Sequence, residues 1–167
     1  MSSAILRTNA IQTIAGKPIL NSTGSVLQVV ATNTVGYGGE ITTSSSSYVT
    51  TGLTAAITPT SASSKLFVQW SGNVKFYANG ANVGDDGIAL KIYRDGAAIT
   101  TSNENLFYRS DANGSAHHSP ATINQYVNAN STSPTAFVLY FADFWGGSAF
   151  ISRDWGTNQF TIWEISA

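Results

Sequence analysis

The chain has no cysteine and few charged residues. Its 167 residues include 8 Lys plus Arg and 9 Asp plus Glu, or 10% charged, where a globular domain usually has about 25%. Without cysteine, disulfides and thiolate metal sites are excluded. The formal net charge of −1 provides no basic surface to neutralise a nucleic-acid backbone, so neither DNA nor RNA is expected as a partner. A surface with so little charge repels copies of itself only weakly.

Long apolar runs and good helix formers are scarce as well. No stretch approaches the roughly 20 apolar residues of a membrane span, and the opening MSSAILRTNAIQT has no apolar run typical of a signal peptide. Ser, Thr, Asn and Gly supply most of the polarity, and these residues suit strands and tight turns. The absence of heptads and of a fixed repeat argues against a fibrous shaft.

Against this background the segment Lys65–Tyr77, KLFVQWSGNVKFY, alternates strictly between two kinds of residue. Leu66, Val68 and Trp70 begin one series, which Val74 and Phe76 would continue on the same side of a strand. A period of two over 13 residues indicates a long strand with one face in a core. We expect such a strand to run through the middle of a sheet.

The remaining strands are predicted from apolar runs between turn signals. Asp95-Gly96 separates two of them and is a strong hairpin signal, whereas residues 32–46 and 110–120 are expected to be loops. The expected strands are Val26–Ala31, Tyr48–Ile57, Lys65–Tyr77, Gly87–Arg94, Ala97–Thr101, Glu104–Arg109, Ala121–Asn130, Pro134–Asp143, Ala149–Arg153 and Asn158–Ile165. Strands at this spacing predict an antiparallel sandwich or barrel.

Residues 1–31 are expected to form an extended arm, with one domain over residues 32–167. The arm is too apolar for a free tail, so it lies either on the edge of its own domain or on a neighbouring subunit or docking partner. The residues that would make this contact are Ile5, Leu6, Ile11, Ile14, Ile19 and Leu20. The segment Val26–Ala31 at its end is predicted to be a buried strand.

Candidate metal sites are weak. His117-His118 could reach one ion from a loop, but no third ligand follows at a recognisable spacing, and a solvated loop tip is the simpler interpretation. Asp85-Asp86 could contribute to a calcium loop, which needs several oxygen ligands in a short span; a polar turn explains the pair equally. No metal or cofactor is therefore expected.

Acid–base chemistry has no better candidate. Asp143, Asp154 and Glu164 lie near Trp145, Trp155 and Trp163 in the sequence. Acids beside tryptophans are typical of sugar sites and also of a core rim where indole N–H groups find acceptors. Trp145 and Trp155 are thus the candidate glycan contacts, and no convergent catalytic set is found.

Glu164 shares a strand face with Phe160 and Ile162, which predicts partial burial. A buried carboxylate needs a partner. Three cations were considered for that role: Arg94, Lys91 and Arg153.

Several segments together resemble a widespread set of small virion proteins of tailed bacteriophages, especially marine phages and cyanophages. The segments are Thr50–Gly72 (TTGLTAAITPTSASSKLFVQWSG), Ile88–Ile99 (IALKIYRDGAAI), Ser119–Ala129 (SPATINQYVNA), Phe160–Ala167 (FTIWEISA) and the leader Leu6–Val30. The positions carried over are structural: Ser64 and Lys65, Arg94-Asp95-Gly96, and Glu164-Ile165. The chain departs from the pattern at Trp163 and in the aromatic-rich segment Phe141–Trp155.

The resemblance implies a jelly-roll sandwich like that of tumour-necrosis-factor-type trimers, assembled as a homotrimer on the particle. It implies no catalytic residue. We expect a non-enzymatic virion protein, made in the host cytoplasm, whose partners are copies of itself and other virion proteins such as the major capsid protein or a tail component. A capsid decoration or cement protein is favoured because the chain has an arm but no shaft. The alternative is a tail-fibre, receptor-binding or glycan-binding module.

Uncharged side chains are expected at the threefold axis, because like residues from three copies meet there. The predicted interface residues are Tyr126, Phe137, Leu139, Phe141 and Trp163.

Overall fold

The computed structural model of the chain describes residues 23–34, 40–77, 84–99, 105–112, 116–144, 146–152 and 157–167. Within these ranges it contains strands and no helix, so no helix there could cross a membrane. The strands are β1 (Val26–Thr34), β2 (Ile41–Thr43), β3 (Val49–Ile57), β4 (Lys65–Tyr77), β5 (Gly84–Arg94), β6 (Ala97–Ala98), β7 (Asn105–Ala112), β8 (His117–Asn128), β9 (Thr135–Phe144), β10 (Ser148–Ser152) and β11 (Asn158–Ile165). The predicted all-β class is confirmed.

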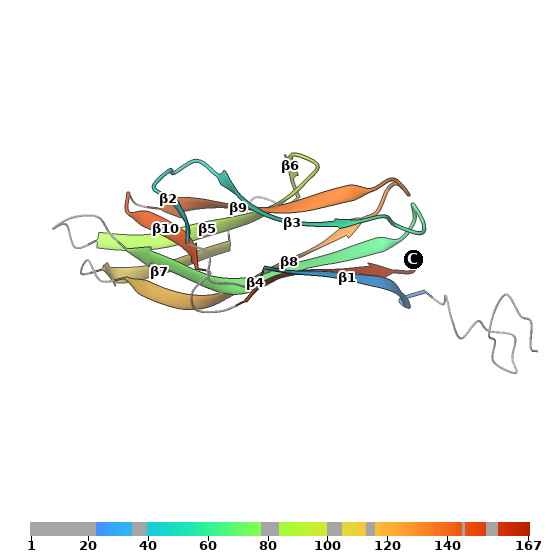
Figure 1. Cartoon of the computed structure of the whole chain (residues 1–167), viewed down its shortest axis with the longest axis horizontal. Coiled ribbons are helices and arrows are strands. Elements are labelled where there is room, and N and C mark those ends of the chain that lie inside the picture. The colour runs from blue at the N-terminus through green and yellow to red at the C-terminus, as the bar shows by residue number, and fades with distance from the viewer. Residues whose placement is uncertain are drawn as a thin grey trace, which may run out of the picture.

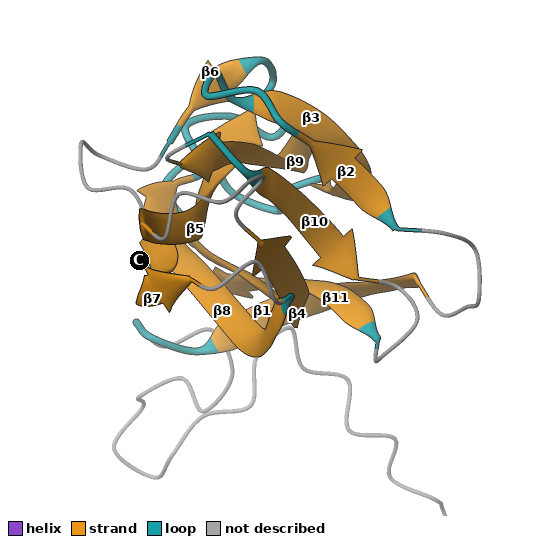
Figure 2. Ribbon diagram, turned by 90° about the vertical axis from the view of Figure 1, so that its left-hand side faces the viewer, coloured by secondary structure: helices purple, strands orange, loops and turns teal. Residues whose placement is uncertain are grey.

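The strands form two antiparallel sheets that pack face to face (Figure 1). In the first sheet, β4 pairs with β11 and then β10 along one edge and with β8 along the other, while β1 pairs with β11 and β2 with β10. In the second sheet, β9 lies between β3 and β5, and β5 pairs on its far edge with β6 and β7. Figure 2 shows the two layers from the end.

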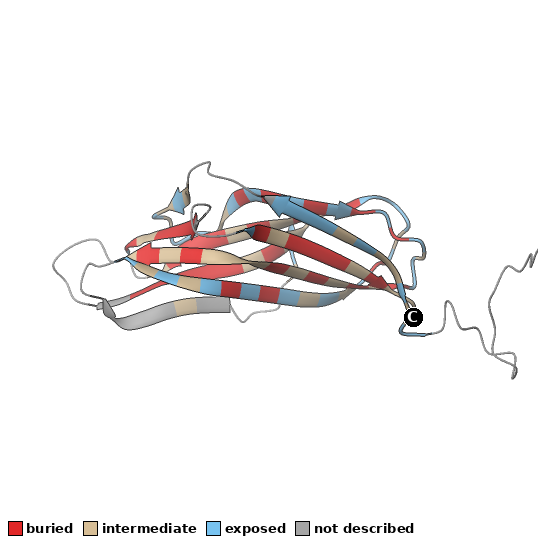
Figure 3. Cartoon of the chain, turned by 60° about the horizontal axis from the view of Figure 1, so that its bottom comes forward, coloured by how far each residue is buried: buried red, intermediate tan, exposed pale blue. Residues whose placement is uncertain are grey.

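β4 is the central strand of the first sheet, as its length predicts. It runs from Lys65 to Tyr77, the same bounds as the sequence pattern. Leu66, Val68 and Trp70 are buried and the residues between them are less so. This alternation recurs along neighbouring strands (Figure 3), because successive side chains of a strand point to opposite faces.

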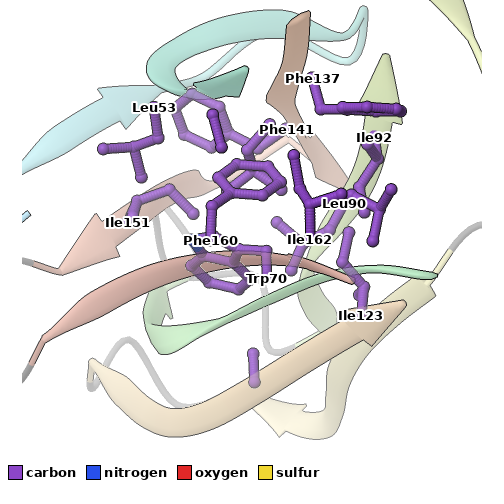
Figure 4. Close-up of a cluster of buried hydrophobic side chains, with 14 of the residues drawn as sticks. Leu53, Trp70, Leu90, Ile92, Ile123, Phe137, Phe141, Ile151, Phe160 and Ile162 are labelled. Carbon is purple, nitrogen blue, oxygen red and sulfur yellow. The ribbon is translucent and has the colours of Figure 1, made fainter. Parts of the chain in front are cut away.

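The core fills the space between the two sheets. Trp70 and Ile162 of the first sheet and Leu90, Phe137 and Phe141 of the second are fully buried there (Figure 4). Their side chains interdigitate in one cluster that also takes in residues of β3, β8 and β10. Burial of a large apolar side chain stabilises by about 1.5–3 kcal/mol, so this cluster is the main source of the fold's stability.

The hairpin at Asp95-Gly96 forms as predicted, although its second strand, β6, is only Ala97–Ala98. Both turn residues have positive φ, 48° for Asp95 and 88° for Gly96, as a two-residue turn between twisted strands requires. The Asp95 carboxylate accepts bonds from the Thr135 hydroxyl at 2.6 Å and the Ala136 amide at 2.9 Å. The turn is thereby fastened to the start of β9.

Three expectations need correction. The segment 110–120 is not one long loop, because β7 extends to Ala112 and β8 begins at His117. The segment 32–46 is not all loop, since it contains the end of β1 and the whole of β2. β1 is a strand but not a buried one: it lies at the edge of the first sheet and Val26 and Val29 are 55% and 52% exposed.

Candidate interaction surface

Four large side chains lie side by side across the outer face of the first sheet. The strand registers pair Val29 with Trp163, Trp163 with Phe67, and Phe67 with Tyr126. Residues directly opposite one another in antiparallel strands point to the same face. The four therefore form a continuous line over β1, β11, β4 and β8, which we call the outer row.

The outer row is apolar and accessible. Tyr126 is 53% exposed and Val29 52%, while Phe67 and Trp163 are half-buried. The rings of Phe67 and Trp163 pack against each other with centroids 5.3 Å apart. Within the described residues, the three side chains that combine large apolar character with high exposure are Val26, Val29 and Tyr126. Two of them lie in this row and Val26 lies on the same edge strand.

Two consecutive rows on one side of the outer row carry no charge. The first consists of Ala31, Thr161, Gln69 and Asn124 in register, and the second of Asn33, Gln159, Ser71 and Thr122. On the other side of the outer row, Lys65 is the nearest cation, and its ammonium donates to the side-chain oxygen of Asn128. The three consecutive rows thus form a neutral surface with aromatic side chains along one margin. Few charges together with aromatic residues are typical of the middle of a protein–protein interface.

The predicted interface residues divide into two groups. Tyr126 and Trp163 lie in the outer row. Phe137, Leu139 and Phe141 have no exposed surface, because β9 turns them into the core of a single protomer. This part of the prediction is corrected: the apolar character of β9 reflects packing between the two sheets, and these three side chains are not available to another subunit.

Other predicted contact residues fall outside the described residues. These are the arm residues Ile5, Leu6, Ile11, Ile14, Ile19 and Leu20 and the tryptophans Trp145 and Trp155. The roles predicted for these residues stay predictions. From Val26 onward, the end of the expected arm is part of β1 and pairs with β11.

Glu164 is completely buried, and its hydrogen-bond donors in the described part of the chain are not the predicted cations Arg94 and Lys91. The third predicted cation, Arg153, lies outside the described residues. Its carboxylate accepts from the Thr60 amide at 2.8 Å, the Thr60 hydroxyl at 2.9 Å, the Ser61 amide at 3.2 Å and Gln28 Nε2 at 2.7 Å. Burial raises the pKa, but these hydrogen bonds, with the Thr60 amide first, outweigh it and lower the pKa of Glu164 to about 2. The carboxylate thus joins β1, β11 and the turn before β4.

The predicted polar turn at Asp85-Asp86 is also corrected. Both residues belong to β5, and Asp86 is only 2% exposed. Asp143, on the neighbouring strand β9, is 1% exposed.

His117 and His118 begin β8 and do not lie at the tip of a loop, and the ring of His117 contacts Phe76. In the described part of the chain, no three His, Cys, Asp or Glu side chains are grouped to hold a metal ion.

Comparisons with known proteins add little to this geometry. No family model matches the chain, and no curated protein matches it. Among solved structures, the dimeric latent PorU of Porphyromonas gingivalis is similar over 94% of this chain, with 12% identity and a TM-score of 0.42. This chain spans 14% of the length of that protein. A likeness this distant carries no argument about function.

Proposed function

We propose that the chain is a non-enzymatic structural protein of a tailed-phage virion, assembled as a homotrimer that decorates the capsid. The observation that carries the proposal is the outer row with its two neutral neighbouring rows. Around a threefold axis, the same residues of three copies lie close together, and like charges among them would repel one another. A surface without charge avoids this repulsion. The sequence resemblance to small virion proteins supplies the biological setting.

The strand order supports a jelly roll. One sheet runs β1-β11-β4-β8 and the other β3-β9-β5-β7. Along the chain, β3, β4 and β5 alternate between the sheets, as do β8, β9 and β11. A double-sheet roll of eight strands is built in this way. In such a roll the outer face of each sheet is free to contact a neighbouring subunit.

The absence of an enzymatic role is part of the proposal. The buried carboxylate of Glu164 is held by four hydrogen-bond donors in a structural joint, and a pKa of about 2 does not suit a general acid or base near neutral pH. Asp143 and Asp86 lie at the end of the core and are almost inaccessible to a substrate. Glu164, Asp143 and Asp86 therefore offer a substrate no accessible acid–base pair.

The location on the particle is tested by labelling intact virions with an antibody to the chain and viewing them by electron microscopy. Label distributed over the head supports capsid decoration. Label restricted to the tail replaces it with the tail-fibre or receptor-binding role. Purified virions that do not contain the chain, checked by mass spectrometry, would overturn the structural role altogether.

A further inference from the structure

A small slot lies between the two sheets, at the side of the molecule where the end strands β1 and β3 come together. The centre of a water-sized sphere has about 10 Å³ of space in it, which is room for one water molecule. Residues of four strands line the slot: Thr32 of β1, Leu53 and Thr54 of β3, Trp70 of β4, and Asn158 and Phe160 of β11.

Trp70 brings an unsatisfied hydrogen-bond donor to this slot. Its side chain is fully buried, and the indole Nε1 has no hydrogen-bond partner in the part of the chain that the structure describes. The indole N–H can only donate, and a buried donor without an acceptor costs free energy. An acceptor in the slot would remove that cost.

Gly72 allows the indole of Trp70 and the side chain of Asn158 to come together. A methyl group added at Gly72 would lie 2.1 Å from Asn158 Oδ1 and 2.6 Å from Trp70 Cζ2, too close for either contact. Cζ2 lies on the same edge of the indole as Nε1, so this edge of the ring is turned towards Asn158. Asn158 is 2% exposed, and an amide oxygen can accept two hydrogen bonds. The slot thus has a donor and an acceptor on its walls.

A β-bulge in β3 lies along the other side of the slot. The register between β3 and β9 shifts within residues 50–54, and Gly52 has a φ of 72°, which favours glycine. The Thr51 hydroxyl donates to the Leu139 carbonyl at 2.8 Å and accepts from the Leu53 amide at 3.0 Å. These hydrogen bonds hold the bulge in place, so the slot beside Leu53 is a fixed feature of the fold.

We propose that the slot binds one ordered water molecule, which accepts a hydrogen bond from Trp70 Nε1 and donates one to Asn158 Oδ1. Buried waters make roughly two to four hydrogen bonds to polar groups that would otherwise be unsatisfied. The water joins β4 to β11 beside the bulge of β3. The site is independent of the proposed virion role, since it lies within a single protomer.

A high-resolution crystal structure of the full wild-type chain tests the site directly. One ordered density peak should lie in the slot, within about 2.5–3.2 Å of both Trp70 Nε1 and Asn158 Oδ1. A direct hydrogen bond from Nε1 to a protein acceptor, or a slot without an ordered peak, would overturn the proposal.

The indole proton of Trp70 gives a second test, in solution. A long-lived water should give this proton a cross-peak to water with the sign of the diagonal in a NOESY spectrum and the opposite sign in a ROESY spectrum. Trp70→Phe assigns the resonance, because it lacks that proton. The absence of the cross-peak, or the sign of the diagonal in both spectra, which indicates hydrogen exchange, would count against a bound water.

The matched control is Thr32→Val, which removes a hydroxyl from the wall of the slot and keeps the size of the side chain. A hydroxyl proton that exchanges with solvent can imitate a bound water in these spectra. The Trp70 cross-peak should persist in Thr32→Val, because the proposed water is held by Trp70 and Asn158. Its loss would assign the signal to the hydroxyl and overturn the proposed water.

Discussion

Trp163 lies directly opposite Phe67 across β11 and β4, and the two rings pack with their centroids 5.3 Å apart. Val29 and Tyr126 extend this contact to the two edge strands of the same sheet. One line of apolar side chains therefore crosses the outer face of β1, β11, β4 and β8. In the proposed assembly, a second copy of the chain would bury the exposed part of this line.

Placing a charge in the outer row should break self-association. Tyr126→Glu introduces a carboxylate at a side chain that is 53% exposed, so the protomer can fold while each interface must bury or repel the charge. We expect at least a tenfold weaker association by sedimentation velocity. The control is Ala56→Glu, at an exposed position of β3 on the outer face of the second sheet, which should associate like the wild type.

Shortening a core side chain should lower the stability of the protomer without changing the residues of the proposed interface. Phe141 is fully buried between the sheets, and Phe141→Ala should lower the free energy of unfolding by about 3–5 kcal/mol, from lost burial and the cavity left behind. Urea unfolding in a Tyr126→Glu background measures this without a contribution from association. Val26→Ala, at a 55% exposed side chain, should change stability by less than about 0.5 kcal/mol.

The Glu164 joint should make the protein sensitive to strong acid. Because the pKa of Glu164 is lowered from 4.5 to about 2, its contribution is complete above pH 4.5 and is lost as the pH falls through 2. A shift of this size corresponds to about 3 kcal/mol. Glu164→Gln should lower stability at pH 7 by about 2–4 kcal/mol, measured by urea unfolding. An unchanged stability would contradict the buried, hydrogen-bonded carboxylate.

Asp143 should have the opposite pH dependence. A pKa raised from 3.8 to about 6 stabilises the protonated fold below pH 3.8, and this stabilisation is lost as the pH rises through 6. Asp143→Asn should therefore increase the free energy of unfolding at pH 7.5 by about 1–3 kcal/mol and leave it nearly unchanged at pH 4. Thermal unfolding at the two pH values gives the comparison, and a variant that is less stable at both would refute the prediction.

Strand periodicity predicted the parts of the fold in which one face is buried. β4 and β11 have the predicted bounds. Large apolar side chains recur at every second position on the buried face, as Leu66, Val68 and Trp70 do in β4 and Phe160 and Ile162 do in β11. β8 starts four residues earlier than predicted, since His117 to Pro120 resemble a loop in composition yet pair with residues 73–76 of β4. The composition of a segment does not reveal such pairing, because the pairing depends on the partner strand.

The candidate surface was only partly predictable for a similar reason. An apolar residue in a strand faces either the core or a partner, and the sequence of β9 does not distinguish them for Phe137 or Phe141. The outer row becomes visible only when four strands are placed in register. The partners of Glu164 were missed because backbone amides at Thr60 and Ser61 leave no mark in the sequence.

The central claim is that the chain assembles as a trimer through the outer row. The mass of the assembly that the purified chain forms tests it most directly. Native mass spectrometry of the purified wild-type chain at micromolar concentration should give three times the protomer mass of 17.6 kDa, and Tyr126→Glu should shift the population to single protomers. A wild-type chain that remains at 17.6 kDa at all concentrations tested, or a trimer that the outer-row substitution leaves unchanged, would contradict the proposed assembly.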